Sequence, residues 1–213
     1  MASVVRINAR STAVFVCDMQ ERFKTAIHGF DHVVDSTSKV LRAAQILELP
    51  VFTTEQNPRA LGSTVCPLAD IIKTLPSISS EAVHAKTRFS MVLPDITDKW
   101  LQSASAVEGG VKSVIMTGIE SHVCVLQTSL DLLERGYQVH VLADAVSSCN
   151  AQEVPLALAR LRQAGAQITT SESILFQLLE DAAHPHFKAV SGLIKEEKLK
   201  TAEALEYLSP KST

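Results

Sequence analysis

Two consecutive units of the chain share the order helix, glycine, strand, and this order limits the fold more than any other feature of the sequence. One predicted helix stops at Gly136 before an apolar run over 138–142, and the next stops at Gly165 before a run over 166–170. The run over 13–17 is apolar without alternation, which is typical of a central strand covered on both faces. This pattern predicts a parallel sheet with right-handed crossovers and helices on both faces.

The other periodic segments extend the same plan. Further strands are expected over 51–54, 81–85 and 113–117, and further helices over 33–49, 68–74, 95–107 and, with a break at Pro185, between 171 and 208. We therefore expect one three-layer α/β/α domain over residues 1–208, built on a six-stranded, mainly parallel sheet, with a tail over 209–213.

The composition is that of an ordinary globular protein and argues against several classes of partner. Hydrophobic residues make up 46% of the chain and charged residues 20%, with a formal net charge of -3. Nucleic acids and membranes are not expected as partners, because phosphate backbones require clustered cations and a membrane-spanning helix requires ~20 apolar residues. The spacing of the four cysteines predicts a reduced, intracellular and most simply cytoplasmic protein, with a mitochondrial association left open.

The stretch from 111 to 128 places one reactive side chain in a defined setting. An apolar β-branched run ends near Gly118, and the helical periodicity that follows puts Cys124 in the first turn of a helix. The unpaired N–H groups and the macrodipole at that end favour a thiolate over a thiol. Cys124 is therefore a candidate nucleophile, although spacing alone leaves open the alternative of a small buried side chain.

Three chemically complementary groups follow predicted strands. Asp18 comes after the first strand, Lys86 after the third and Cys124 after the fourth. Sites in such sheets form beyond the carboxyl ends of the strands, so these groups are expected to meet. A carboxylate can accept the proton of a thiol, and an ammonium group can stabilise the resulting thiolate, so the set suits activation of a nucleophile.

Four short motifs then show a family resemblance that covers nearly the whole chain. They are Val16-Cys17-Asp18-Met19-Gln20 with Phe23, Ala85-Lys86-Thr87-Arg88-Phe89-Ser90, Thr117-Gly118-Ile119-Glu120 through Cys124, and Asp144-Ala145. Together they resemble the isochorismatase-like cysteine hydrolases, a superfamily that includes nicotinamidases and N-carbamoylsarcosine amidohydrolase. The runs over 54–58 and 184–188 resemble more closely the eukaryotic isochorismatase domain-containing proteins. The resemblance implies the strand order 3-2-1-4-5-6 and a homo-oligomer, either a dimer or a tetramer.

The resemblance also assigns roles to individual positions. Asp18, Lys86 and Cys124 correspond to the catalytic triad of the superfamily. A cis peptide bond is implied between Ile119 and Glu120, and the backbone N–H groups of Glu120 and Cys124 are implied to form an oxyanion hole. The expected partner is a small-molecule amide or acyl compound, hydrolysed through a thioester on Cys124.

The loop after the second strand argues against a metal cofactor. Nicotinamidases of the superfamily carry paired histidines there, whereas the segment over 55–62 contains none. We therefore expect no cofactor and no metal, and do not expect nicotinamide as the substrate. Because the chain keeps the thiol of Cys124, covalent chemistry is favoured over isochorismatase-type vinyl-ether hydrolysis. That reaction, and a scaffold that retains the triad but acts mainly in protein interaction, stay open as alternatives.

Three further side chains are candidates for substrate binding. Phe23 would stack on a planar substrate at the pocket edge, or else serve as a core aromatic. Gln56 would form a hydrogen bond to substrate, or else lie on the surface. His122, two residues before the nucleophile, would touch substrate, or else face solvent at the start of the helix.

Other polar residues and thiols are expected to be structural. His184 and His186 flank a proline far from the triad in sequence, so structural or exposed roles are favoured over metal binding. Asp144 is expected at a strand end, with its carboxylate bonded to backbone. Cys17 and Cys149 are expected to be buried thiols without disulfides.

Overall fold

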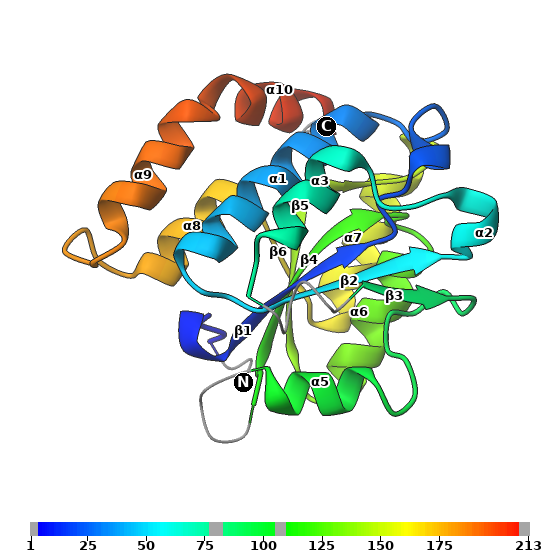
Figure 1. Cartoon of the computed structure of the whole chain (residues 1–213), viewed down its shortest axis with the longest axis horizontal. Helices are drawn as coiled ribbons and strands as arrows, with labels where there is room; N and C mark the ends of the chain where they lie inside the picture. The colour runs from blue at the N-terminus through cyan, green and yellow to red at the C-terminus, as the bar shows by residue number, and fades with distance from the viewer. Residues whose placement is uncertain (1–3, 77–82, 105–109, 209–213) are drawn as a thin grey trace.

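A six-stranded sheet forms the middle layer of the computed structural model, which describes residues 4–76, 83–104 and 110–208. The strands are β1 (Thr12–Cys17), β2 (Val51–Gln56), β3 (Val83–Lys86), β4 (Ser113–Ile119), β5 (Gln138–Ser147) and β6 (Gln167–Thr169). Each pairs in parallel with its neighbours, in the order β3-β2-β1-β4-β5-β6 (Figure 1). The predicted α/β class and strand order are confirmed.

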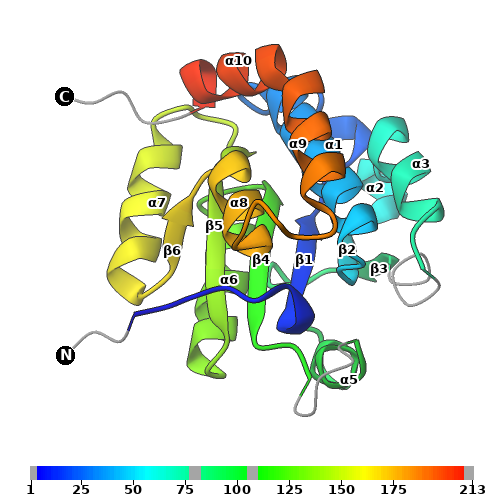
Figure 2. The same ribbon diagram turned by 90° about the vertical axis from the view of Figure 1, so that its left-hand side faces the viewer.

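Helices cover both faces of this sheet (Figures 1 and 2). One face carries α1 (Phe30–Ile46), α3 (Cys66–Lys73), α8 (Ser171–Leu179), α9 (Phe187–Glu196) and α10 (Lys198–Leu208). The other face carries α5 (Thr97–Ser103), α6 (Cys124–Glu134) and α7 (Glu153–Ala164). The short helices η1 (Ala9–Ser11), η2 (Glu21–Phe23) and α2 (Pro58–Leu61) lie in the connections. Among the described residues, no helix has the length and apolar character needed to cross a bilayer.

The central strand β1 shows how the sequence separates two cores. Its six residues are all buried, and successive side chains point to opposite faces. Val14 and Val16 join the core under α1, whereas Phe15 and Cys17 join the core under α6. Burial of one large apolar side chain contributes about 1.5–3 kcal/mol, so a strand buried on both faces anchors both layers.

The first long helix begins and ends about one turn earlier than predicted. The sequence pattern predicts a helix over 33–49, whereas α1 spans Phe30–Ile46. Gly29 adopts φ +61°, a conformation that glycine enters without strain, and this turn allows the helix to begin at Phe30. The chain then leaves the helix before Pro50, as the proline requires.

The bounds of α3, β2, β4 and β6 differ from the predicted ones by one or two residues, and parts of three predictions lie outside the described residues. The helix predicted over 95–107 is the shorter α5, and residues 105–109 lie outside the described part. The strand predicted over 81–85 is described only from Val83 and continues to Lys86. The predicted tail over 209–213 is also outside the described residues.

Strand β5 is longer than its sequence suggests, and the expected turn at Asp144 is wrong. The strand continues through Asp144 to Ser147. The buried carboxylate of Asp144 accepts hydrogen bonds from the backbone N–H of Ser171, at 2.8 Å, and from the Ser171 hydroxyl. Because a buried carboxylate is tolerated when it is hydrogen-bonded, the acid caps α8 without ending the strand.

Gly118 marks the closest approach of β4 to the end of β1. It pairs with Cys17 and adopts φ +105°. A Cβ atom at this position would lie 2.1 Å from the carbonyl oxygen of Cys17. Only glycine fits this backbone without displacing it.

All four cysteines are free thiols, and one is placed differently from the prediction. Cys17 is buried, as expected. Cys149 is exposed, so the prediction of a buried thiol is wrong there. Cys149 lies beyond the end of β5, in the connection to α7, where neither core covers it.

Candidate active site

The ends of three elements meet at one edge of the sheet. Asp18 directly follows β1, Lys86 is the last residue of β3, and Cys124 is the first residue of α6. Their exposed fractions are 1%, 4% and 7%. The structure therefore brings together the three residues that the sequence singles out, in a setting nearly free of bulk water.

The Lys86 ammonium group lies between the acid and the thiol. Its Nζ atom is 2.6 Å from Asp18 Oδ2 and 3.6 Å from Cys124 Sγ. A carboxylate oxygen of Asp18 and the sulfur of Cys124 lie within 4.8 Å of each other. Charge-assisted hydrogen bonds in such a dry site are stronger than in water.

Further acceptors complete the surroundings of Lys86. Its Nζ donates to Gln56 Oε1 at 2.7 Å, to the Phe89 carbonyl at 2.9 Å and to the Arg88 carbonyl at 3.3 Å. The two carbonyls belong to the segment that follows β3, so the chain folds back over its own lysine. These contacts fix the position of the ammonium group.

The electrostatic surroundings of Lys86 favour its charged form. Burial opposes the charge, but the acidic groups around the ammonium group, among them the Asp18 carboxylate in contact with it, outweigh burial and raise the pKa of Lys86. Lys86 is therefore a cation at neutral pH. The side chain of Asp18 is equally buried, so the two charges are stabilised by contact with each other and not by solvent.

The turn after β1 positions the Asp18 carboxylate. Asp18 adopts φ +50°, a region that aspartate tolerates better than most residues. Its backbone N–H donates to the Thr54 carbonyl at 3.2 Å, and the Thr54 hydroxyl donates to Asp18 Oδ1 at 2.7 Å. Thr54 is a positioning residue that sequence reasoning missed, because a buried threonine in a strand carries no signal of its own.

Gln20 is a second positioning residue that the sequence did not reveal. Its side chain is fully buried; Nε2 donates to the carbonyls of Gln56, at 3.0 Å, and Gly62, at 2.6 Å. Its Oε1 accepts the backbone N–H of Gln56 at 2.7 Å. The amide therefore holds the loop after β2 against the loop after β1. The only signal is the place of Gln20 in the motif with Asp18.

The turn between β4 and α6 presents two unpaired backbone N–H groups. The Ile119–Glu120 peptide bond is cis. The N–H groups of Ser121 and Val125 donate to the carbonyls of Ser147 and Glu120, at 2.8 and 3.1 Å. Within the described part of the chain, the N–H groups of Glu120 and Cys124 donate to no backbone carbonyl. They are free to receive a negatively charged oxygen.

The three residues predicted to bind substrate have other contacts in this structure. Gln56 accepts from Lys86 and donates through Nε2 to the Thr87 carbonyl at 2.8 Å, so its amide serves the lysine. Phe23 is half-buried in η2 and packs against the core under α1. The half-buried His122 has its Nδ1 2.9 Å from the Ser148 hydroxyl.

Two groups of side chains bring potential metal ligands within 4.8 Å of one another in the described residues. The first is Cys17, Asp18 and Cys124. The Lys86 ammonium group already donates to the Asp18 carboxylate there, and its positive charge repels a cation. The second is Glu120, His122 and Cys149 at the rim, where the Glu120 carboxylate already accepts the Cys149 N–H at 2.8 Å. Neither arrangement requires a metal to satisfy its charges.

The paired histidines near the C-terminal helices lie apart from this site. His184 and His186 occupy the connection between α8 and α9, with ring centroids 5.6 Å apart. The backbone N–H of His186 donates to Nδ1 of His184 at 3.2 Å. This contact gives the pair a local structural role.

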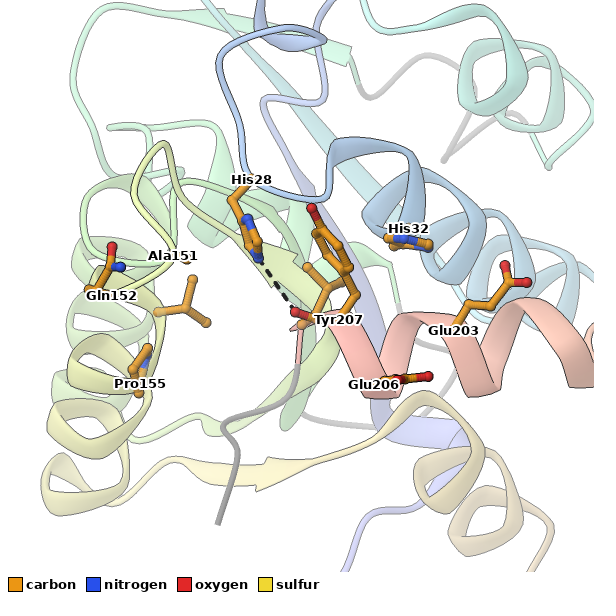
Figure 3. A pocket seen from close by; sticks show the side chains of 10 residues that line it. His28, His32, Ala151, Gln152, Pro155, Glu203, Glu206 and Tyr207 are labelled. Carbon is orange, nitrogen blue, oxygen red and sulfur yellow. Dashed lines mark hydrogen bonds between the residues drawn. The ribbon is translucent and has the colours of Figure 1, made fainter. Parts of the chain in front are cut away.

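Two cavities differ in their relation to the candidate site. The one in Figure 3, of about 610 Å³, lies where α1, α7 and α10 meet, and in it the Tyr207 ring stacks on His28, with centroids 4.6 Å apart. None of the three predicted catalytic residues lines it. A second cavity, of about 570 Å³, is lined by Lys86 together with Arg59 and Arg88.

Comparison with known proteins agrees with this fold. The family model described as the Isochorismatase domain matches residues 12–173, a span that contains the predicted triad. The chain belongs to the isochorismatase family. The family's isochorismatase domain-containing protein 2 from Xenopus laevis is 44% identical over 192 residues, covering 90% of this chain and 87% of the relative.

Solved structures of the isochorismatase fold are similar over almost the full length. The MAR1 ribonuclease structure from Caenorhabditis elegans superposes with a TM-score of 0.81, at 42% identity, covering 90% of this chain and 93% of that one. The YcaC structure from Escherichia coli, described as an octameric hydrolase of unknown specificity, has a TM-score of 0.76 at 21% identity and covers 97% of both chains. At that identity, YcaC supports the fold alone.

Proposed function

We propose that this isochorismatase-family chain is a metal-independent cysteine hydrolase that acts on a small amide or acyl compound. The observation that carries the proposal is the placement of Lys86 Nζ 2.6 Å from Asp18 Oδ2 and 3.6 Å from Cys124 Sγ in a buried site. A cation in contact with both a general base and a thiol, with the base and the thiol within 4.8 Å of each other, supplies the parts that a covalent acyl transfer needs.

The reaction begins with proton transfer and attack. Asp18 takes the thiol proton of Cys124 while the Lys86 ammonium group stabilises the thiolate. The sulfur attacks the substrate carbonyl, forming a C–S bond and moving an electron pair onto the carbonyl oxygen. The free N–H groups of Glu120 and Cys124 then donate to this oxyanion.

The second half of the cycle releases two products. The oxyanion collapses, the bond to the leaving amine breaks, and Asp18 returns its proton to that amine. A water molecule then gives a proton to Asp18 as its oxygen attacks the thioester carbonyl. The C–S bond breaks, Cys124 leaves as the thiolate or recovers the proton, and the free acid departs.

The side chains around the triad suggest which parts of the substrate are recognised. Phe23 and His122 stand on the two loops that flank Asp18 and Cys124, so we assign them to the walls of the substrate site. Gln56 is assigned to orienting Lys86, since both ends of its amide are engaged. Arg59 and Arg88 line the cavity at the end of β3 next to Lys86, and their charges favour substrates that carry an acidic group.

The test is intact-mass spectrometry of the protein exposed to a panel of small amides, ureides and acyl compounds, each in neutral and carboxylated form. Wild type is expected to gain an acyl adduct or to turn over the compound, and Cys124→Ala is expected to do neither. Cys149→Ser removes an exposed thiol near the site and serves as the matched control, since it should retain the adduct. An adduct that persists in Cys124→Ala would falsify the assignment.

Alternatives remain distinguishable in the same panel. The similarity to a structure named MAR1 ribonuclease makes a labelled RNA a necessary member, and isochorismate tests vinyl-ether hydrolysis. Turnover of isochorismate that survives Cys124→Ala would favour the vinyl-ether reaction. Turnover of RNA alone would replace the amide proposal. No turnover together with an unreactive Cys124 would favour the scaffold.

We also propose that the protein is a homo-oligomer, a dimer or a tetramer. The edge strand β3 and the segment after it expose three apolar side chains, Val83, Phe89 and Ile96, at 39%, 50% and 40%. Apolar groups at a sheet edge are typical of surfaces that another chain covers. Light scattering across a dilution series measures the state, and a monomer at all concentrations would contradict the proposal.

A further inference from the structure

A second thiol lies beside the proposed nucleophile, and hydrolysis does not use it. Cys17 is the last residue of β1, fully buried, and belongs to the same core under α6 as Cys124. The two sulfurs lie within 4.8 Å of each other. Cys17 Sγ also lies 3.6 Å from Asp18 Oδ2, as a donor to the same carboxylate oxygen that contacts Lys86.

The two thiols differ in surroundings and access. Burial, then a hydrogen bond to Cys124, then the charge of Asp18 raise the pKa of Cys17 well above its ordinary value. Cys17 therefore stays a neutral thiol and is closed to solvent. Cys124 keeps 7% of its surface exposed, and its sulfur lies 3.6 Å from the Lys86 ammonium group.

We propose that Cys124 and Cys17 form an oxidation site for hydroperoxides, in which Cys17 captures oxidised Cys124 as a disulfide. A reactive thiol next to a second, resolving cysteine is the arrangement that redox-sensitive sites share, and the cation beside Cys124 and the adjacent Cys17 provide it here. The proposal shares with the proposed function the reactive thiolate of Cys124, but it does not depend on any hydrolytic substrate.

The first step consumes the peroxide. The Cys124 thiolate attacks one peroxide oxygen, an S–O bond forms and the O–O bond breaks. The sulfur loses two electrons to the peroxide, and Cys124 becomes a sulfenic acid. The departing hydroxide or alkoxide takes a proton from solvent or from the Lys86 ammonium group, which lies 3.6 Å from the sulfur.

The second step forms the disulfide and releases water. Asp18 takes the proton of Cys17 along the contact that already exists, and the Cys17 sulfur attacks the sulfur of Cys124. The S–O bond breaks, and the leaving hydroxide is protonated by Asp18 or Lys86. Two thiols and one hydroperoxide thus yield one disulfide, one water and one further water or alcohol.

The sulfurs must approach from within 4.8 Å to a bond length of about 2.05 Å. The hydrogen bond between the two thiols already directs the sulfurs toward each other. The disulfide blocks Cys124 reversibly and protects it from the irreversible higher oxides.

The test is peptide mapping by mass spectrometry after brief exposure to hydrogen peroxide and trapping of the remaining thiols with N-ethylmaleimide. Wild type is expected to give a peptide pair joined through Cys17 and Cys124, and dithiothreitol should restore both thiols. In Cys17→Ala the pair is lost, and Cys124 is expected to accumulate sulfinic and sulfonic acids that dithiothreitol does not reverse. Cys149→Ser, which removes the exposed thiol beyond β5, should behave as wild type.

Three results would overturn the proposal. They are oxidation of Cys124 without the cross-link, a cross-link from Cys124 to Cys149 instead, and an unoxidised Cys124 under conditions that oxidise the exposed Cys66. If Cys17→Ala folds poorly, Cys17→Ser replaces it, because serine is close to cysteine in volume. The cross-link in wild type tests the proposal without any variant.

Alkylation by iodoacetamide separates the redox proposal from the proposed hydrolase function. Fast alkylation of Cys124 without a cross-link would contradict the redox proposal alone.

Discussion

Among the described residues, two lysines are almost fully buried, one at the candidate site and one in a helix that covers the sheet. Lys86 lies at the candidate site with an exposed fraction of 4%, and Lys39 lies in α1 with 1%. The pKa of Lys86 is raised, whereas burial lowers the pKa of Lys39 despite the more distant charges of nearby acids. The difference lies in direct contacts.

The contacts explain why folding favours the charged form of Lys86 and disfavours that of Lys39. Lys86 has a carboxylate at 2.6 Å, whereas the bond that Lys39 makes within the described residues is to the Thr201 hydroxyl at 2.6 Å. A carboxylate in contact compensates the desolvation of an ammonium group, and a hydroxyl does so only in part. The comparison teaches that burial alone does not identify a functional lysine; its acceptors do.

The largest expected effect comes from removing the Lys86 charge. Lys86→Met leaves Asp18 as a buried, uncompensated carboxylate, so the free energy of unfolding should fall by about 3–5 kcal/mol. Alkylation of Cys124 by iodoacetamide should slow in parallel, since the thiolate loses its cation. Urea unfolding and intact-mass kinetics measure the two effects. An unchanged stability would mean that Asp18 and Lys86 are not a compensated ion pair.

The buried side chain of His140 extends the comparison to a base with an unpaired ring nitrogen among the described residues. Nε2 of His140 has no hydrogen-bond partner within the described residues, and burial lowers the pKa of His140 from 6.5 to about 4. Between pH 6.5 and pH 4, His140 is therefore protonated in the unfolded chain but neutral in the folded protein. The free energy of unfolding should fall by about 3 kcal/mol across this range.

The control for this pH dependence is a neutral replacement. His140→Gln should lack this part of the acid loss, although other groups still titrate in both proteins. The difference between the two urea-unfolding profiles across that range isolates the histidine. Parallel profiles would show that His140 is protonated in the folded protein.

An intermediate effect is expected from the hydroxyl that holds Asp18. Thr54→Val keeps the shape of the side chain and removes the 2.7 Å hydrogen bond to Asp18 Oδ1. A hydrogen bond to a charged group contributes about 1.5–3 kcal/mol, so unfolding should become easier by roughly that amount. Thr54→Ser restores the hydroxyl and should recover most of the loss. Failure of serine to recover it would assign the effect to packing.

The smallest change is expected at the other lysine. Lys39→Met replaces a partly compensated amine with an apolar side chain of similar length, so stability at pH 7 should change by less than about 1 kcal/mol or increase. Because the pKa of Lys39 is lowered on folding, wild type should also gain stability as the pH rises toward the value of an unfolded lysine, and the variant should not. A loss comparable to that of Lys86→Met would contradict the comparison.

The sequence predicts the architecture well because its signals are local. Apolar runs, helical periodicity and the glycines at 136 and 165 act within a few residues, and they predict the six strands and the main helices, although not the short helices η1, η2 and α2. The meeting of Asp18, Lys86 and Cys124 at the ends of the first, third and fourth strands follows from the same parallel topology.

What the sequence does not predict depends on contacts between distant segments. Thr54 and Gln20 hold the site through hydrogen bonds that span 36 residues, and nothing in their own neighbourhoods indicates this. Asp144 was misplaced at a strand end because its partner, Ser171, lies 27 residues away. The exposure of Cys149 likewise depends on which helices cover the end of β5.

The packing of the last three helices has a consequence for any shortened form of this protein. The family match ends at residue 173, within the first turn of α8, yet α8, α9 and α10 supply part of the core that closes over α1. A fragment that stops at 173 would remove Val190, Leu193 and Ala204 from that core, and with them Thr201, the hydrogen-bond partner of the buried Lys39. The folding unit therefore extends well past the boundary that family similarity suggests.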